Sequence, residues 1–275
     1  MTITHDRDHD TDGLERALDD VEIIRRSPHI GTEIRGLDLT SLDDAATAAL
    51  RREFAARKVL VFRDVDLSPA QHVDAVSIFD EPFDHPTAVR HPDHRLVYPY
   101  EVRTTGKASR WHVGGLWRDP VFGIESLVYE VVPETGGDTI WADLQAAYDD
   151  LSAPIKDLVT RVGVLYDANP SNYAQGATRA PVADTIEHAL VYDNPRNGRR
   201  GLFLSTSGVG FTGVSPSEGA ALVDFLAEHA SQPKYQARFG WAVGDFVLWD
   251  NRATWHVAVD DYGDAPRAYR KVIAG

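Results

Sequence analysis

The sequence lacks cysteine altogether and has a single methionine among its 275 residues. Without cysteine there is no disulfide, no thiolate metal ligand and no cysteine nucleophile, so any metal site must use histidine and acidic side chains. Basic residues are also in the minority, with 28 Lys and Arg against 42 Asp and Glu, which gives a net charge of -14. This balance argues against a nucleic-acid polymer or an anionic membrane as the partner.

Long hydrophobic runs are missing as well. No apolar stretch reaches the length that a membrane-spanning helix needs, and the first twenty residues are polar and charged rather than a hydrophobic signal segment. We therefore expect a soluble, cytoplasmic protein. Residues 1–20 are predicted to be a disordered or loosely ordered tail. Residues 21–275 are predicted to form a single domain, because no repeat or linker divides them. The oligomeric state stays open.

Helix signals are few but specific. Residues 43–57 carry apolar side chains at helical spacing. Ser68-Pro69-Ala70-Gln71 combines an N-cap, a first-turn proline and a capping-box partner, and predicts a helix to about residue 79. Ser215-Pro216-Ser217-Glu218 repeats this pattern before a helix to about residue 229.

Short strand-like runs separated by turn residues make up much of the remaining chain. The sequence therefore predicts a mainly β fold with peripheral helices, as in a barrel or jelly roll. The predicted strands cover residues 59–62, 126–132, 189–192, 202–205, 245–249 and 270–273.

Two histidines stand out as metal ligands. His112 follows Trp111, and His256 lies far downstream after Trp255. A His-x-Asp/Glu pair with a distant His is the facial arrangement that holds Fe(II) and leaves positions open for co-substrate and oxygen. The residue at the acidic position here is Gly114, which has no side chain.

Several further landmarks occur in order along the chain, and together they resemble the taurine dioxygenase family of Fe(II)/2-oxoglutarate oxygenases. The resemblance implies a double-stranded β-helix, which is a cupin-like jelly roll, and the cofactors Fe(II), 2-oxoglutarate and O2. The landmarks are Gly36-Leu37-Asp38-Leu39, Val61-Phe62-Arg63-Asp64, His85-Pro86, Trp111-His112, Gly136-Gly137-Asp138-Thr139-Ile140-Trp141, Trp249-Asp250-Asn251-Arg252, His256, Arg267 and Arg270.

The resemblance also implies roles for individual residues. His112 and His256 would bind iron. Arg267 would hold the distal carboxylate of 2-oxoglutarate, for which a planar guanidinium is well shaped, and Thr139 would add a hydroxyl donor. The run Asp250-Asn251-Arg252 is expected to form a supporting turn.

A cationic corner for a small anionic substrate is also expected. His85 and Arg270 match positions that hold the substrate's sulfonate in the family, although one residue fewer separates Arg267 from Arg270 than in the family pattern. Arg110 would add positive charge, and Trp117 would add a face for a flat ring. A nucleotide such as a deoxyadenosine monophosphate is the favoured substrate, with a free amino acid second.

Gly114 leads to a specific functional hypothesis. With no carboxylate at this position, one coordination site on iron is free, and a halide can enter it. The chain then resembles the halogenating members of this superfamily, which replace the acid by Gly or Ala. The sequence predicts chlorination of an unactivated C–H bond, with chloride as the fourth requirement after Fe(II), 2-oxoglutarate and O2.

Other interpretations remain open. Gly114 could be misaligned, with Asp119 or Glu125 as the true ligand, although the spacing from His112 to Thr139 matches the family without a gap. The chain could be a degenerate relative, a hydroxylase that uses two histidines and water, or a hydroxylase whose acid was replaced in the laboratory. A hydroxylase of a small anionic metabolite and a non-catalytic jelly-roll binding protein are the rival functions.

Overall fold

The structure is a computed structural model that describes residues 14–15, 18, 21–102, 108–173 and 180–275. Its largest element is a seven-stranded sheet in the order β1-β2-β3-β13-β5-β15-β4, with only β2 and β3 parallel. The strands are β1 (Glu22–Arg25), β2 (Thr32–Arg35), β3 (Val59–Arg63), β4 (Tyr98–Val102), β5 (Ile124–Val131), β13 (Phe246–Asp250) and β15 (Arg267–Ala274).

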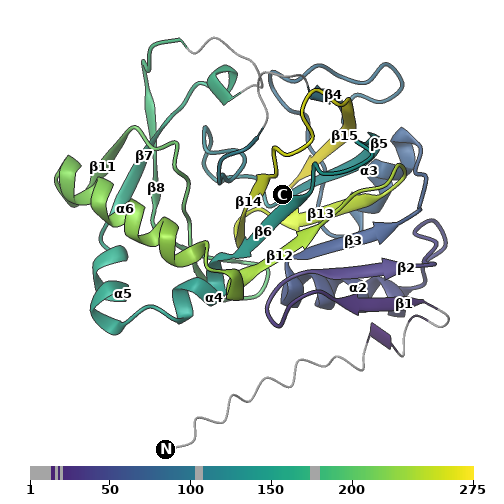
Figure 1. The fold of residues 1–275 in the computed structure, drawn as a ribbon, viewed down its shortest axis with the longest axis horizontal. Helices are drawn as coiled ribbons and strands as arrows, with labels where there is room; N and C mark the ends of the chain where they lie inside the picture. Colours follow the sequence, from purple (N-terminus) through teal and green to yellow (C-terminus); the bar gives the residue numbers. More distant parts are fainter. Residues whose placement is uncertain (1–13, 16–17, 19–20, 103–107, 174–179) are drawn as a thin grey trace, which may run out of the picture.

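A three-stranded antiparallel sheet in the order β12-β6-β14 lies against the seven-stranded one (Figure 1). The sheet β11-β7-β8 lies toward the other side of the molecule (Figure 1), and β10 pairs with β9 in a two-stranded sheet. Their strands are β6 (Thr139–Asp143), β7 (Gly163–Asp167), β8 (Thr185–Ala189), β9 (Val191–Asp193), β10 (Arg200–Leu202), β11 (Gly210–Thr212), β12 (Gln236–Phe239) and β14 (Thr254–Ala258).

Helices are peripheral to these sheets, as the sequence predicts. Both predicted capping boxes are present, at Ser68 with Gln71 and at Ser215 with Glu218. The described helices are α2 (Asp44–Arg57), α3 (Pro69–Ser77), α4 (Leu144–Asp149), α5 (Ala153–Val159), α6 (Pro216–Ala230) and the short 3-10 helices Pro170–Tyr173 and Pro233–Tyr235. The predicted fold class, mainly β with peripheral helices, is confirmed.

The central strands β3, β13 and β5 of the seven-stranded sheet are buried on both faces for most of their length. Alternate side chains along each strand point to opposite sides, so each face packs against a different layer. On one face, Leu60 and Phe62 of β3 pack with α2 and α3. On the other face, Val59 and Val61 pack toward Trp141 of β6. This second layer, between the two sheets, is the interior of the jelly roll and holds the functional residues described below.

Part of the predicted N-terminal tail lies outside the described residues. The described Leu14 and Leu18 are nevertheless buried in the core cluster beside α2 and α3. At these two positions the segment packs onto the domain.

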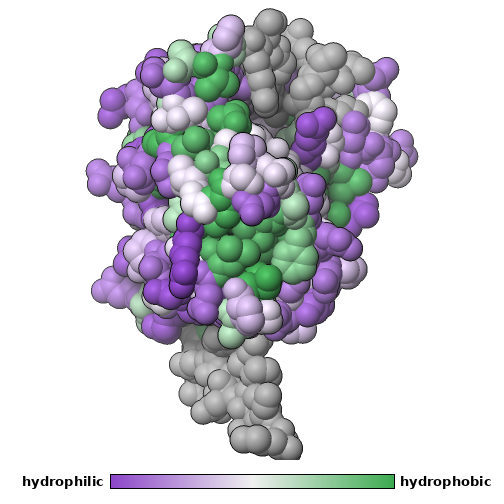
Figure 2. All heavy atoms as spheres, turned by 90° about the vertical axis from the view of Figure 1, so that its left-hand side faces the viewer, coloured by the Kyte–Doolittle hydropathy of each residue, from purple (hydrophilic) through white to green (hydrophobic). Residues whose placement is uncertain are grey.

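The side of the molecule that carries α5 and α6 is partly apolar at its surface. Figure 2 shows hydrophobic residues gathered in the middle of this face, surrounded by hydrophilic ones. Leu158 of α5 and Phe225 of α6 are among the exposed large hydrophobic residues. In the described part of the chain, no helix is both long and apolar enough to cross a membrane.

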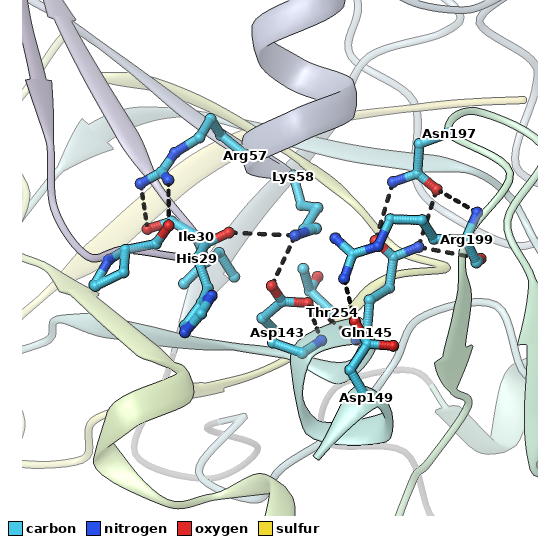
Figure 3. Close-up of polar contacts among 12 residues, drawn as sticks. His29, Ile30, Arg57, Lys58, Asp143, Gln145, Asp149, Asn197, Arg199 and Thr254 are labelled. Atoms are coloured by element: carbon cyan, nitrogen blue, oxygen red, sulfur yellow. Dashed lines mark hydrogen bonds and ion pairs between the residues drawn. The ribbon is translucent and has the colours of Figure 1, made fainter. Parts of the chain in front are cut away.

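A buried ion pair joins the two main sheets (Figure 3). Lys58 follows α2 with a left-handed backbone, and its Nζ donates to Asp143 Oδ2 at 2.7 Å and to the carbonyl oxygen of His29 at 3.2 Å. Asp143 ends β6, and its other oxygen accepts from the first backbone amides of α4. Both side chains are almost fully buried, so each needs the other's charge.

Candidate active site

His112 and His256 face each other between the sheets. Reciprocal backbone hydrogen bonds of 3.0 Å join the two residues, and their ring centroids are 4.1 Å apart. His256 lies on β14 opposite Trp141 of β6, and its ring packs edge-on against Trp249 at 4.8 Å. The structure therefore brings together the two histidines that the sequence predicts as metal ligands.

Both imidazoles are prepared for a metal ion rather than for carrying charge. Burial lowers the pKa of His112 and holds that of His256 well below its ordinary value, so both rings are neutral at pH 7. Nδ1 of His112 donates to the carbonyl oxygen of Arg110 at 2.7 Å, which leaves Nε2 with the free lone pair. Nδ1 of His256 is buried without a hydrogen-bond partner. This donor set fits Fe(II).

A supporting amide fixes the backbone beside this pair. Gly114 N donates to Asn251 Oδ1 at 3.0 Å, and Asn251 Nδ2 donates back to Gly114 O at 2.7 Å. Asn251 is fully buried and follows β13 directly. The predicted supporting role of this turn thus takes the form of a clamp on the residue two positions after His112.

The space beside Gly114 is filled by an acid from another strand. A Cβ atom added to Gly114 would lie only 1.5 Å from Oε1 of Glu125. Glu125 lies near the start of β5, is 3% exposed, and accepts from Lys271 Nζ at 2.7 Å. Burial alone would lower the pKa of Lys271, but the Glu125 carboxylate holds it above its ordinary value. The family spacing places neither Asp119 nor Glu125 at the position of the acidic ligand, but the fold brings the Glu125 carboxylate against Gly114.

In the described structure, His112, His256 and Glu125 do not form one metal-binding cluster. Across the ranges that the structure describes, no three His, Asp or Glu side chains are close enough to hold a metal ion together. Glu125 nevertheless acts on the same environment, since its charge opposes the effect of burial on the pKa of His112 and His85.

Arg267 and Thr139 lie together, as expected. Arg267 Nη2 donates to Tyr129 Oη at 3.0 Å and to Thr139 Oγ1 at 3.4 Å, while its Nε is buried without a hydrogen-bond partner. Trp241 Nε1 donates to the same threonine oxygen at 3.1 Å. Among the described residues, no acid forms an ion pair with Arg267. A 5%-exposed guanidinium with hydroxyl neighbours is suited to an anion from outside the chain.

The predicted substrate residues are only partly brought together. His85 packs edge-on against Trp117 at 5.5 Å, and its Nδ1 accepts from the amides of Thr87 and Ala88. Burial lowers the pKa of His85, and so does nearby Lys271. Arg110 has an exposed side chain, and its carbonyl oxygen accepts from His112 Nδ1.

Arg270 lies elsewhere, which corrects the expected anion corner. Its Nη2 donates to the carbonyl oxygen of Leu67 at 2.5 Å, and its Nε lies 2.9 Å from Glu130. Arg267, Tyr269 and Lys271 share the opposite face of β15, because side chains alternate along a strand. The cation beside His85 and Glu125 is therefore Lys271, at the spacing from Arg267 that the family pattern has.

Comparison with known proteins agrees with this arrangement. Residues 22–273 match the model of the family described as "Taurine catabolism dioxygenase TauD, TfdA family". The chain belongs to this family. It is therefore an Fe(II)- and 2-oxoglutarate-dependent dioxygenase in its general class, and the expected jelly-roll fold is confirmed.

Curated relatives and solved structures cover nearly the whole chain. An alkylsulfatase of Acinetobacter baylyi is 28% identical over 95% of this chain and 87% of its own length. An alpha-ketoglutarate-dependent sulfate ester dioxygenase of Pseudomonas putida is 31% identical over 90% and 87%. A taurine dioxygenase structure from Burkholderia xenovorans has a TM-score of 0.79 and 32% identity, covering 92% of this chain and 90% of that one. The structure of AAD-2 with Mn(II) and N-oxalylglycine has a TM-score of 0.77 and 27% identity over 93% and 97%.

Several active-site residues escape sequence reasoning. Tyr129 and Trp241 look like ordinary core aromatics, and their rings stack at 4.3 Å beside Arg267. Lys271 is detectable from strand alternation counted from Arg267. Glu125 was singled out only as one of the two nearest downstream acids, because its approach to Gly114 depends on how β5 passes the loop after His112.

Proposed function

We propose that this protein uses Fe(II), 2-oxoglutarate and O2 to hydroxylate a C–H bond of a small organic anion. The observation that carries the proposal is the pair of neutral imidazoles of His112 and His256. In the same interior layer lies the guanidinium of Arg267, which forms no ion pair with an acid of the described residues. The similarity to dioxygenases whose names specify 2-oxoglutarate dependence supports hydroxylation over the chlorination expected from Gly114.

Each residue has a defined task in this proposal. His112 and His256 hold iron through their neutral rings, and Asn251 keeps the backbone beside them in place. Arg267 binds the far carboxylate of 2-oxoglutarate, with Thr139 as a hydroxyl partner. Iron with 2-oxoglutarate and O2 supplies the oxidising power to break the substrate's C–H bond. The N-oxalylglycine in the similar AAD-2 structure has the same oxo-acid and carboxylate groups as 2-oxoglutarate.

The substrate anion binds at Lys271 with help from His85. Both lie near Glu125 and on the side of the histidine pair, and Trp117 provides an aromatic wall against His85. The names of three relatives specify a sulfate ester, a phenoxyacetate and a sulfonate, and all of these are anions. As candidate substrates, we rank a sulfate ester, a sulfonate or an aryloxy carboxylate first and a nucleoside monophosphate after them.

Chlorination is the second candidate, and a single residue favours it. Gly114 offers no carboxylate to iron, so a halide can take the third protein position if Glu125 stays with Lys271. The relatives named above are dioxygenases and an alkylsulfatase, which places chlorination behind hydroxylation.

One assay tests both candidates. Purified protein is loaded with Fe(II) without oxygen, supplied with 2-oxoglutarate and sodium chloride, and exposed to air with each substrate class, including deoxyadenosine and its monophosphate. We expect 2-oxoglutarate to be consumed in step with substrate, and mass spectrometry to show a product heavier by one oxygen atom. Where the hydroxyl enters the carbon that bears the ester oxygen, ether oxygen or sulfur, the adduct breaks down, and we expect the carbonyl fragment with released sulfate, sulfite or phenol instead. A product with the isotope pattern of chlorine would replace hydroxylation by halogenation. No substrate-dependent consumption with any anionic class would contradict both.

A further inference from the structure

The polar side chains around Arg267 offer more hydrogen-bond donors than acceptors. Arg267 Nη2 donates to Tyr129 Oη at 3.0 Å and to Thr139 Oγ1 at 3.4 Å, and Trp241 Nε1 donates to the same threonine oxygen at 3.1 Å. Guanidinium and indole groups only donate, so the two hydroxyl oxygens are the only acceptors that these four side chains have. We call the four side chains the donor cluster.

The hydroxyl proton of Tyr129 has no acceptor within the donor cluster. A hydroxyl has one proton and two lone pairs, and both lone pairs of Thr139 Oγ1 already accept N–H groups. Among the residues that the structure describes, neither hydroxyl donates to a carbonyl or carboxylate oxygen. Tyr129 is 1% exposed, so water cannot easily accept the proton instead. A buried O–H group without an acceptor is costly unless a ligand supplies one.

Tyr129 is also a neutral donor that is held in a fixed place. Burial raises the pKa of Tyr129 to about 12, so the phenol keeps its proton at pH 7. Its ring stacks on the ring of Trp241 at 4.3 Å and meets Tyr269 edge-on at 5.9 Å. An anion that reaches the Arg267 guanidinium therefore also meets the phenol hydroxyl beside it.

We propose that Tyr129 is a further binding residue for the far carboxylate of 2-oxoglutarate, to which its hydroxyl donates beside Arg267 and Thr139. This inference rests on the proposed function, which places that carboxylate at Arg267. An ionised carboxylate only accepts hydrogen bonds, and it brings the lone pairs that the donor cluster lacks. The bond from the phenol is charge-assisted, because its acceptor is an anion.

Trp241 is a positioning residue in this arrangement. Its N–H takes one lone pair of Thr139 Oγ1 and Arg267 takes the other, so the threonine proton must point to a different acceptor. The stacked ring of Trp241 also fixes the plane of the Tyr129 ring. Trp241 thus acts on the carboxylate through the two hydroxyl groups.

Anaerobic calorimetry of the Fe(II)-loaded protein with 2-oxoglutarate tests the role of Tyr129 without turnover. Tyr129→Phe keeps the stacked ring and removes only the hydroxyl, and we expect the Kd for 2-oxoglutarate to rise about 10-fold. Tyr166→Phe is the matched control, because Tyr166 is also fully buried but donates to the carbonyl oxygen of Ser205 from β7, in a different sheet. The Tyr166→Phe protein should bind 2-oxoglutarate like the unaltered protein.

A ligand without the far carboxylate separates a direct contact from a general loosening of the site. 2-Oxopentanoate has the same carbon chain with a methyl group in place of that carboxylate, so Tyr129→Phe should not weaken its binding. The role of Trp241 is tested in the same way with a second substitution. Trp241→Phe should weaken 2-oxoglutarate binding on its own but add nothing to Thr139→Val, because its effect passes through the threonine hydroxyl.

The outcomes are distinct. A folded Tyr129→Phe protein that binds 2-oxoglutarate as tightly as the unaltered protein, or more tightly, would overturn the inference. So would an equal loss of affinity for 2-oxopentanoate. An equal loss from Trp241→Phe with and without the Thr139 hydroxyl would remove the positioning role. If the unaltered Fe(II)-loaded protein binds no 2-oxoglutarate, the proposed function itself fails.

Discussion

In the proposed function, Arg267 is the residue on which binding of the co-substrate depends most. Its guanidinium is 5% exposed and contacts hydroxyls, so an incoming carboxylate gains a charge-assisted bond in a poorly solvated place. Arg267→Ala should weaken 2-oxoglutarate binding by about 3–5 kcal/mol, because the carboxylate would be left buried without its partner. Anaerobic titration of the Fe(II)-loaded variant measures this loss.

The control for that measurement is Arg238→Ala. Arg238 is a half-exposed arginine that pairs with Asp138 near the edge of the smaller sheet. The Arg238→Ala substitution should leave the affinity for 2-oxoglutarate unchanged. Equal affinities in the Arg267 variant and the unaltered protein would show that the co-substrate lies elsewhere.

Single residues also show where sequence reasoning succeeds and where it stops. His112, His256, Thr139 and Arg267 were predicted from ordered landmarks, and the structure gathers them between the sheets as two close pairs. Arg270 was misplaced because residue type was matched ahead of strand alternation, which assigns the inward position to Lys271. Glu125 was considered only as a nearby acid, and its contact with Gly114 was out of reach because that contact joins distant segments.

Among the larger elements, β6 and α4 depend on the buried pair of Asp143 and Lys58. Asp143→Ala would leave the Lys58 ammonium buried without a counter-charge and would remove the N-cap of α4. We expect a loss of about 3–5 kcal/mol in the free energy of unfolding. Urea denaturation followed by circular dichroism provides the measurement.

The exposed pair of Asp193 and Arg200 is the matched control. Asp193→Ala should leave the denaturation midpoint unchanged, because solvent already screens this pair. If Asp143→Ala were equally harmless, the buried pair would have no structural role.

The ends of helices and strands were predictable where a local pattern sets them, but not where contacts between distant segments do. The starts of α3 and α6 were predictable, because a capping box is a local pattern of side chain and backbone. The predicted strand at 202–205 is largely wrong: β10 covers Arg200–Leu202 and pairs with β9. Apolar runs predict burial, but hydrogen bonding to a partner decides where a strand ends.

On the scale of the whole molecule, a strongly acidic protein has to attract organic anions. The net charge of -14 repels them at long range, so recognition must come from local cations inside the fold. Arg267 and Lys271 lie on one face of β15, and in the proposed function they provide these charges for the co-substrate and the substrate. The jelly roll brings both to the layer that holds the histidine pair.

The central claim is that this interior layer is one Fe(II)/2-oxoglutarate site. The most direct measurement is anaerobic titration of the protein with Fe(II) and then 2-oxoglutarate, followed by visible absorption, with His256→Ala in parallel. We expect one Fe(II) per chain and a charge-transfer band that appears only with both additions and is absent from the variant. An unaltered protein without this band, or a variant that retains it, would contradict the account.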